Sequence, residues 1–414
     1  MANPSTTNPA PLRLVLLITF LGSMGTAIIT SGLSFIADQG IGYSGTQNLV
    51  LALVLGAVYI PAALLSATIQ KKSLNLGLNT KRLLLVMMIL ITIIAQVPMV
   101  VQWIDPAWTE AGLWILGIGY MILVGILWPI IEAYLSGGRS GKTLRSAIGK
   151  FNIVWSTSMV LAYWLMAPLI KSSPLLIVSL LGGVHILIAA VVWKLPDEPP
   201  KVSTPQTTDH PTPPVYRPLL SIFRVMLICS YIILSAIIPL MPSTQARLGL
   251  DELWWTPIAS TWLIVRVFVF FLFERWHGWH GQWWTPWFGM SAMLLGFALS
   301  MGSPMLGIVD GEGVNVLGVL TLTAGLSLMG VGIAVTYYGA LYYAMAVGGS
   351  DIDSGGKHEA LIGVGYTVGP LCGLIGGAIY SNALGVIGVT SIIVLTLVTW
   401  TAYSTTKQQN NKIA

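Results

Sequence analysis

The sequence predicts an all-α integral membrane protein with twelve transmembrane helices in two six-helix bundles. The composition is the first reason, because 55% of the 414 residues are hydrophobic and only 8% are charged, far more apolar than is usual for a soluble protein. The second is that apolar runs of roughly 20 residues, each long enough to cross a hydrocarbon core of about 30 Å, recur from Leu14 onward. The third is a polar, proline-rich stretch near the midpoint, with six runs on either side.

The predicted spans follow one another with short polar or basic connections between them. They cover residues 14–37, 47–69, 83–103, 112–136, 151–170, 175–193, 219–241, 255–275, 286–306, 316–347, 359–383 and 386–404. The first run is too long for the apolar core of a signal peptide and no convincing cleavage site follows it. We therefore expect it to remain as the first membrane helix.

Basic residues sort to one side of the predicted membrane. If the N-terminus is cytoplasmic, all but three of the 20 Lys and Arg residues fall inside. The exceptions are Lys171 and Arg247, which fall outside, and Arg266, which lies within a span. The positive-inside rule thus predicts a multi-pass protein of a plasma or inner membrane with both termini in the cytoplasm. This distribution explains the net charge of +5 without a nucleic-acid partner.

The chain divides into two predicted halves, residues 1–193 and 219–414, joined by a cytoplasmic linker at 194–218. The linker reads KLPDEPPKVSTPQTTDHPTPPVYRP, and its proline, threonine and charged residues cannot bury a core. Six spans in each half are typical of a duplicated transporter whose halves are related by an axis along the membrane normal.

Twelve spans, a long linker after the sixth and inside termini resemble the major facilitator superfamily over essentially the whole chain. That family has a signature, roughly G-x-x-x-D-R-x-G-R-R, in the loop between helices two and three. Here the stretch SATIQKKSLNLGLNTKR keeps Gly77, Lys81 and Arg82 but has no aspartate. By resemblance, helices one, two, four, five, seven, eight, ten and eleven line a central cavity, and the other four face lipid.

The second half holds a better match to the loop signature. FERWHGWH at 273–280 places Glu274 and Arg275 at the acidic and basic positions of the motif. In the family this acidic residue tethers helices in one gating state. The resemblance therefore implies that Glu274 and Arg275 take part in coupling or gating.

Two charged residues within predicted spans are candidates for direct roles. Arg266 lies near the middle of its span, where a charge is costly unless it is paired or hydrated, so we expect it to bind an anionic group of a solute. It could instead pair with an acid that releases it during transport. The structural alternative is a fixed ion pair or a contact with backbone carbonyls between helices. Glu132, the only clearly intramembrane acid in this prediction, lies toward the cytoplasmic end of helix four. It is a candidate proton carrier or gate, or else a helix-end acid that reaches water or the basic loop Arg139–Lys150.

Polar and aromatic residues on two further helices suit a solute-binding wall. In TYYGALYYAMA, Tyr338 and Tyr342 have the i, i+4 spacing that places side chains on one helical face, and each offers a ring and a hydroxyl. An interfacial aromatic belt is the alternative. In FNIVWSTSMV, Asn152 and Trp155 could line an aqueous path or form contacts between helices.

Several other chemistries find no support in the sequence. Cys229 and Cys372 lie in opposite halves, and His277 and His280 lack further ligands, so we expect no disulfide, metal or other cofactor. GGRSGKT at 137–143 superficially resembles a phosphate-binding loop, but its first glycine is misplaced, which argues against ATP-driven activity.

The sequence thus favours a secondary active transporter, not an enzyme, that moves a small solute by alternating access. Arg266 favours an anionic solute, but a cationic or neutral solute could still use the tyrosine-rich wall. Its partners would be the solute and the lipid bilayer; coupling to a proton or another ion is left open, and we expect a monomer. A non-transporting membrane sensor or accessory protein is the main alternative, since an eroded loop motif is compatible with lost transport. An integral-membrane transferase is disfavoured, because acids or histidines do not cluster at one membrane face.

Overall fold

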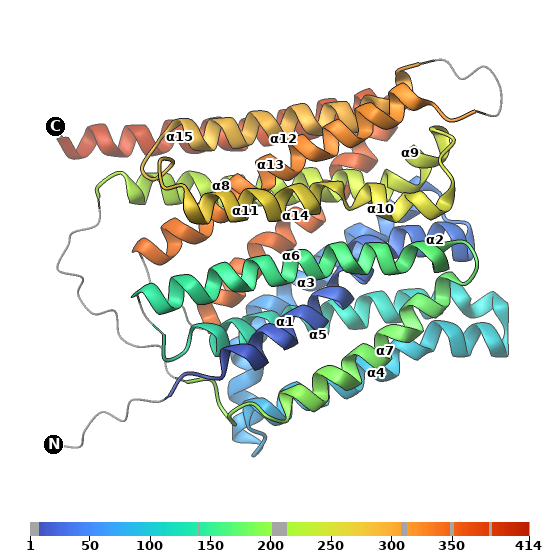
Figure 1. Ribbon diagram of the computed structural model, residues 1–414, viewed down its shortest axis with the longest axis horizontal. Helices are drawn as coiled ribbons and strands as arrows, with labels where there is room; N and C mark the ends of the chain where they lie inside the picture. The colour runs from blue at the N-terminus through green and yellow to red at the C-terminus, as the bar shows by residue number, and fades with distance from the viewer. Residues whose placement is uncertain are drawn as a thin grey trace.

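The computed structural model describes residues 8–139, 141–200, 213–307, 313–347, 352–380 and 383–413. Within these ranges every regular element is helical, and twelve helices are long and apolar enough to cross a membrane, which confirms the predicted fold class. The chain is a multi-pass integral membrane protein. Its helices lie side by side along the long axis of the molecule, and the first and last helices have their terminal ends on the same side (Figure 1).

The first half contains six spans. The first span is α1 (Leu12–Ala27), which continues through a π-helical turn (Ile28–Gly32) into α2 (Leu33–Ile41). The others are α3 (Gly45–Asn75), α4 (Thr80–Ile104), α5 (Thr109–Ser136), α6 (Gly141–Ile170) and α7 (Pro174–Val192). Ser44 defines the start of α3, because its hydroxyl caps the amide of Gln47 while the Gln47 side chain accepts from the Ser44 amide.

The second half also contains six spans, two of them broken. Span seven is α8 (Tyr216–Ile237), a 3-10 turn (Ile238–Leu240) that contains Pro239, and α9 (Met241–Arg247). Span eight is α10 (Trp255–Ala259) followed by α11 (Thr261–Arg275). The remaining spans are α12 (Trp284–Gly302), α13 (Val316–Val347), α14 (Ile352–Ile379) and α15 (Ala383–Ile413).

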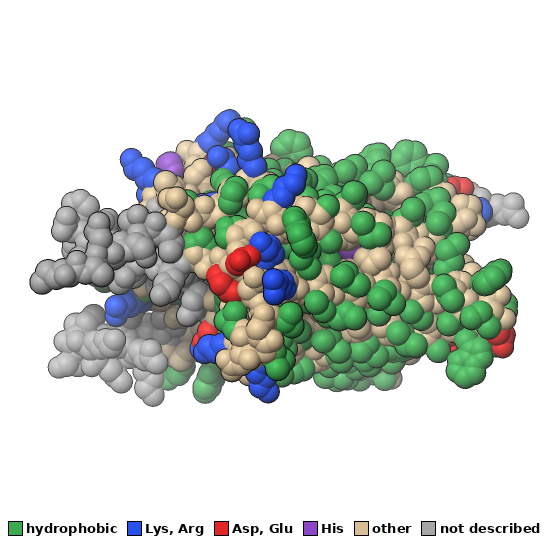
Figure 2. Space-filling model, turned by 90° about the horizontal axis from the view of Figure 1, so that it is seen from below, with side chains coloured by type: hydrophobic (Ala, Val, Ile, Leu, Met, Phe, Trp, Pro, Cys, Tyr) green, Lys and Arg blue, Asp and Glu red, His purple; other side chains and the backbone are tan. Residues whose placement is uncertain are grey.

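The two ends of the bundle differ in charge. One end, here called the basic end, is where α1 begins and α15 ends, and Lys and Arg side chains gather toward it while hydrophobic side chains cover most of the remaining face in Figure 2. The opposite end carries acidic residues such as Glu110 and Glu252. This separation of charge is the one that the positive-inside pattern predicted from the sequence.

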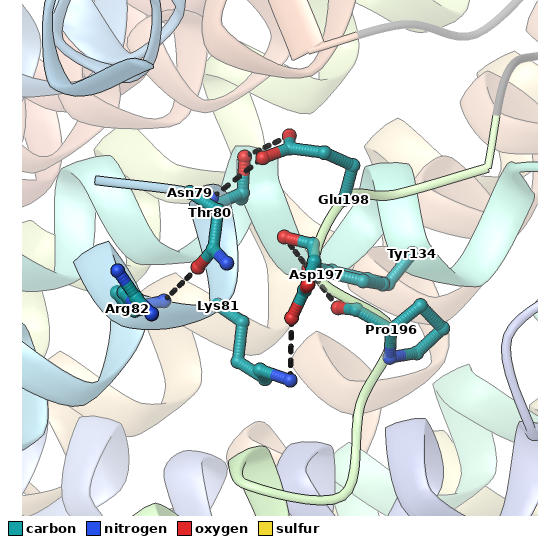
Figure 3. A network of polar contacts seen from close by, with 8 residues as sticks. All are labelled: Asn79, Thr80, Lys81, Arg82, Tyr134, Pro196, Asp197 and Glu198. Atoms are coloured by element: carbon teal, nitrogen blue, oxygen red, sulfur yellow. Dashed lines mark hydrogen bonds and ion pairs between the residues drawn. The ribbon is translucent and has the colours of Figure 1, made fainter. Parts of the chain in front are cut away.

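The start of the predicted linker packs against the basic end of the first six spans (Figure 3). Glu198 accepts a hydrogen bond from the Thr80 amide at 2.9 Å and another from the Thr80 hydroxyl, at the first residue of α4. Asp197 forms an ion pair with Lys81 at 2.5 Å. A carboxylate is favourable at a helix N-terminus, so Glu198 stabilises the start of α4. Residues 201–212 of the predicted linker lie outside the described residues.

The two halves approach each other most closely along α3 and α14. A Cβ atom on Gly56 of α3 would lie only 2.5 Å from the carbonyl carbon of Tyr366 on α14. A Cβ atom on Gly363 of α14 would lie 2.8 Å from the side chain of Ile60 on α3. Small residues at these positions allow the two backbones to pack directly, as is common between membrane helices.

The halves also meet at the end opposite the basic end. There the Lys171 ammonium group lies 3.0 Å from a carboxylate oxygen of Glu252, which belongs to the other half. The turn Ile238–Leu240 packs against α2 and α3 nearby. At the basic end, in contrast, a hollow of about 420 Å³ lies between α6, α11 and α13. The halves therefore contact each other at the end opposite the basic end, and a hollow lies between them at the basic end.

Candidate functional site

A cavity of about 70 Å³ lies between the two halves. Its lining residues come from α1 with the following π-helical turn, α3, α5, α6, α8, α11, α13 and α14. These are spans one, two, four, five, seven, eight, ten and eleven, the same eight that the family resemblance implied. The π-helical turn contributes Thr30 and Ser31, so the irregular part of the first span faces the cavity.

Arg266 enters this cavity from α11 and is almost completely buried, with 1% of its surface exposed. Its guanidinium carbon lies 3.8 Å from the ring centroid of Trp155. Three more rings surround it at 5.0–5.6 Å: Tyr337, Phe270 and Trp262. Its Nε and Nη2 atoms have no hydrogen-bond partner, and among the described residues no acid forms an ion pair with it. The site therefore holds a buried cation with unused donors.

Two acids from opposite halves line the same cavity. Glu132 comes from α5, and Glu359, which is 9% exposed, comes from α14. The Tyr59 hydroxyl of α3 donates to Glu359 Oε2 at 2.5 Å. A Cβ atom on Gly355 would lie 2.9 Å from Glu132 Oε2, so the Glu132 carboxyl group reaches α14 one turn before Glu359. No cation forms an ion pair with either acid within the described ranges.

Tyrosines connect the cationic and acidic parts of the cavity. Tyr231 of α8 and Tyr366 of α14 pack edge to face with ring centroids 5.3 Å apart, and Tyr366 also packs against Tyr59 at 6.0 Å. The Tyr231 phenol lies within electrostatic range of Arg266 and of both glutamates. A bound solute would thus meet hydroxyl groups and ring edges between the charged groups.

The predicted solute-binding residues separate into two groups. Arg266 and Trp155 line the central cavity. Asn152, Tyr338 and Tyr342 line the hollow at the basic end instead. The two spaces adjoin, because the Trp155 indole donates to Asn152 Oδ1 at 3.2 Å, one turn nearer the basic end of α6. The binding roles of all five residues stay predictions.

The predicted coupling or gating residues are also divided. Glu132 lies in the central cavity with Arg266, although the sequence suggested a shallower position near the helix end. Glu274 lines the hollow at the basic end, and the Arg275 guanidinium carbon lies 3.7 Å from the ring centroid of Phe271. Their involvement in coupling or gating stays a prediction.

The prediction that Glu132 is the only clearly intramembrane acid was wrong, because Glu359 lines the same cavity. Glu359 follows the polar segment SGGKH and is the first residue of its predicted span, so its position indicated a helix end near water rather than a buried site. A signal did exist in the spacing of Glu359, Ile362 and Tyr366, which lie on one helical face and all line the cavity. Tyr59 and Tyr231 also line the cavity, although neither was predicted to do so.

The hollow at the basic end contains titratable groups of both signs. Lys142 and Arg145 of α6 face Glu274, His277 and His280 across it. His280 stacks on Tyr342 with ring centroids 4.2 Å apart. Burial, and then the nearby positive charge of His277 and Arg145, lowers the pKa of His280 to about 4, so its ring is neutral at pH 7. The described residues contain no group of three or more side chains suited to hold a metal ion.

No family model matches the sequence, and no curated protein matches it. Solved structures do match it. A mutant of the nucleoside transporter NupG is 15% identical with a TM-score of 0.62, covering 96% of this chain and 98% of that chain. A proton-dependent oligopeptide transporter structure is 11% identical with a TM-score of 0.63, covering 95% and 96%. The E. coli fucose:proton symporter FucP, a major facilitator superfamily transporter, is 13% identical in its outward conformation with a TM-score of 0.55, covering 95% and 98%. This chain therefore has the fold of the major facilitator superfamily transporters.

Proposed function

We propose that this protein is a secondary active transporter that moves a small solute with an anionic group by alternating access. The observation that carries the proposal is Arg266, a buried guanidinium between the two halves with two nitrogens that have no hydrogen-bond partner. A buried charge without a partner is costly, and a carboxylate or phosphate group would relieve that cost through charge-assisted hydrogen bonds.

The arrangement of the halves supports movement of the solute rather than binding alone. The cavity lies between two six-helix halves, which contact each other at one end and leave a hollow at the other. With the basic end and both termini in the cytoplasm, this is the arrangement expected when the site is shielded from the outside and approached from the inside. Rocking of the halves would reverse this access.

The residues around the route have distinct proposed roles. Trp155 and Tyr337 hold the Arg266 side chain and separate the cavity from the hollow. Asn152, Tyr338 and Tyr342 line the approach from the basic end, where Glu274 and Arg275 act in gating. The cavity of about 70 Å³ admits only a few non-hydrogen atoms in this state, so the solute is small or the site widens when it binds.

The direct test is flux into proteoliposomes that contain the purified protein. Small carboxylates and inorganic phosphate would be assayed for uptake and efflux, with and without a pH gradient. We expect selective flux in the wild type and loss of that flux in Arg266→Gln. Arg217→Gln is the control, because it removes a positive charge from an exposed position. Flux that survives in folded Arg266→Gln would contradict the proposed site, and binding without flux would favour the sensor or accessory function.

A further inference from the structure

We propose that the transported solute is a small zwitterion, whose carboxylate binds Arg266 and whose ammonium group binds the pair Glu132 and Glu359. This inference rests on the proposed function and names the chemical class of the solute. It depends on the placement of one buried cation and two buried acids around a single cavity.

The opposite charges belong to different walls of the cavity. Arg266 lies on α11, which packs against α6 and α13, and its aromatic neighbours Trp155 and Tyr337 come from those two helices. The acids lie on α5 and α14, which pack against each other and against α3. No ion pair joins the two walls among the described residues. The charges therefore do not neutralise each other, and a ligand between them can contact both.

A count of charge favours a zwitterion over a simple anion. Two carboxyl groups that line one buried cavity do not both ionise readily, so we expect the acidic wall to carry one negative charge. Arg266 supplies one positive charge on the other wall. A zwitterion matches both charges, whereas a simple anion pairs with Arg266 and leaves the remaining buried carboxylate without a cation to pair with.

The acidic wall is organised to keep a carboxylate in place. The Tyr59 hydroxyl donates to one oxygen of the Glu359 carboxylate. Gly355 has no side chain, which leaves room for the Glu132 carboxyl group next to α14. The tyrosines Tyr231 and Tyr366 lie between the walls and offer ring edges for a short apolar body. At about 70 Å³ the cavity suits a molecule whose two charged groups are only a few bonds apart.

The test compares each small zwitterion with analogues that lack one charged group. Glycine, alanine, β-alanine and γ-aminobutyrate would each be titrated by calorimetry into the full chain in nanodiscs, alongside the matching deaminated acid and decarboxylated amine. For alanine these analogues are propionate and ethylamine. At least one zwitterion is expected to bind about tenfold or more tightly than both of its analogues, because each analogue leaves one buried charge unpaired.

Two variants assign the charged groups to their walls. Glu359→Gln is expected to abolish the preference for the zwitterion over its deaminated acid, while Arg266→Gln abolishes the preference over the amine. Glu110→Gln, an exposed acid that accepts from Tyr43 far from the cavity, is expected to change neither. The comparison of each zwitterion with its deaminated acid and its decarboxylated amine uses the wild-type protein alone. It therefore tests the inference even if Glu359→Gln does not fold.

Two results would overturn the inference. If a deaminated acid binds as tightly as its zwitterion, the solute is a simple anion; the transporter proposal survives, and Glu132 and Glu359 have another role. If the folded protein binds none of the probes, small zwitterions are excluded as solutes. The flux of small carboxylates and inorganic phosphate in proteoliposomes then tests the transporter proposal separately.

Discussion

Aromatic rings rather than an acid hold the positive charge of Arg266 in place. The guanidinium carbon lies over the Trp155 ring, 3.8 Å from its centroid, and three further rings surround it. Aromatic faces stabilise a cation without consuming its hydrogen-bond donors. Arg266 can therefore stay buried and still present Nε and Nη2 to a ligand.

Replacing Arg266 by lysine separates charge from shape. Lysine keeps the positive charge but is compact, strongly hydrated and unable to stack its charged group or bind a carboxylate with two parallel hydrogen bonds. We expect Arg266→Lys to weaken solute binding by about tenfold or more and to slow uptake at low solute concentration. Calorimetry and uptake kinetics on the same preparation provide the measurement. Unchanged affinity would mean that charge alone is sufficient.

His280 gives the basic end a defined response to acid. Its pKa is about 4 in the folded protein, against 6.5 for an ordinary histidine, so the unfolded chain binds a proton more readily. This contribution to stability is present above about pH 6.5 and is lost as the pH falls toward 4. We expect His280→Gln to reduce the fall in thermal stability over that range, measured by melting curves in detergent. If the melting temperature depends on pH in the same way for the variant and the wild type, the proposed role of His280 is wrong.

At the residue scale the sequence predicts only part of the site. Arg266 was identifiable because a lone charge in an apolar span is conspicuous. Glu359 was not, because it sits at the polar start of its span. Tyr338 was preferred to Tyr337, but the helical pattern of α13 does not indicate which face meets the cavity; the structure places Tyr337 there and Tyr338 in the hollow.

The contact between α3 and α14 makes a prediction about one pair of helices. Gly56→Ala would place a methyl group 2.5 Å from the backbone of Tyr366, which cannot be accommodated without moving a helix. We expect a loss of stability of about 1–3 kcal/mol, the usual cost of overpacking, and a lower melting temperature. Gly183→Ala on α7 is the matched control, because nothing lies within 4 Å of its added methyl group. Equal melting temperatures for both variants would refute the close packing.

Helix positions were predictable, but breaks inside them were not. Apolar length located all twelve spans because each must cover the hydrocarbon core with its backbone hydrogen-bonded. The π-helical turn at Ile28–Gly32 and the interruption at Ser260 both lie inside apolar spans. Hydropathy averages over such features. These breaks in the helices depend on packing between the halves, which the sequence of one span does not predict.

For the whole molecule, the end opposite the hollow depends partly on an ion pair between the halves. Lys171 and Glu252 are partly exposed, so their attraction is screened by salt. We expect Lys171→Glu to favour opening at this end, and the swap Lys171→Glu with Glu252→Lys to restore closure. The readout is labelling of a Thr30→Cys reporter in the cavity by an impermeant maleimide added from that side. Equal labelling rates in low salt would show that the pair does not influence closure.

The attachment of the linker to the first half has a consequence for biosynthesis. Glu198 reaches Thr80 across 118 positions of the chain, and both belong to the stretch that is synthesised before any helix of the second half. The first half can thus complete its basic end while the ribosome is still making α8. If the two halves were expressed as separate polypeptides, a break after Pro200 would keep this attachment within the first half. A break before Pro196 would remove it, together with the hydrogen bond from the Tyr134 hydroxyl to the Pro196 carbonyl oxygen.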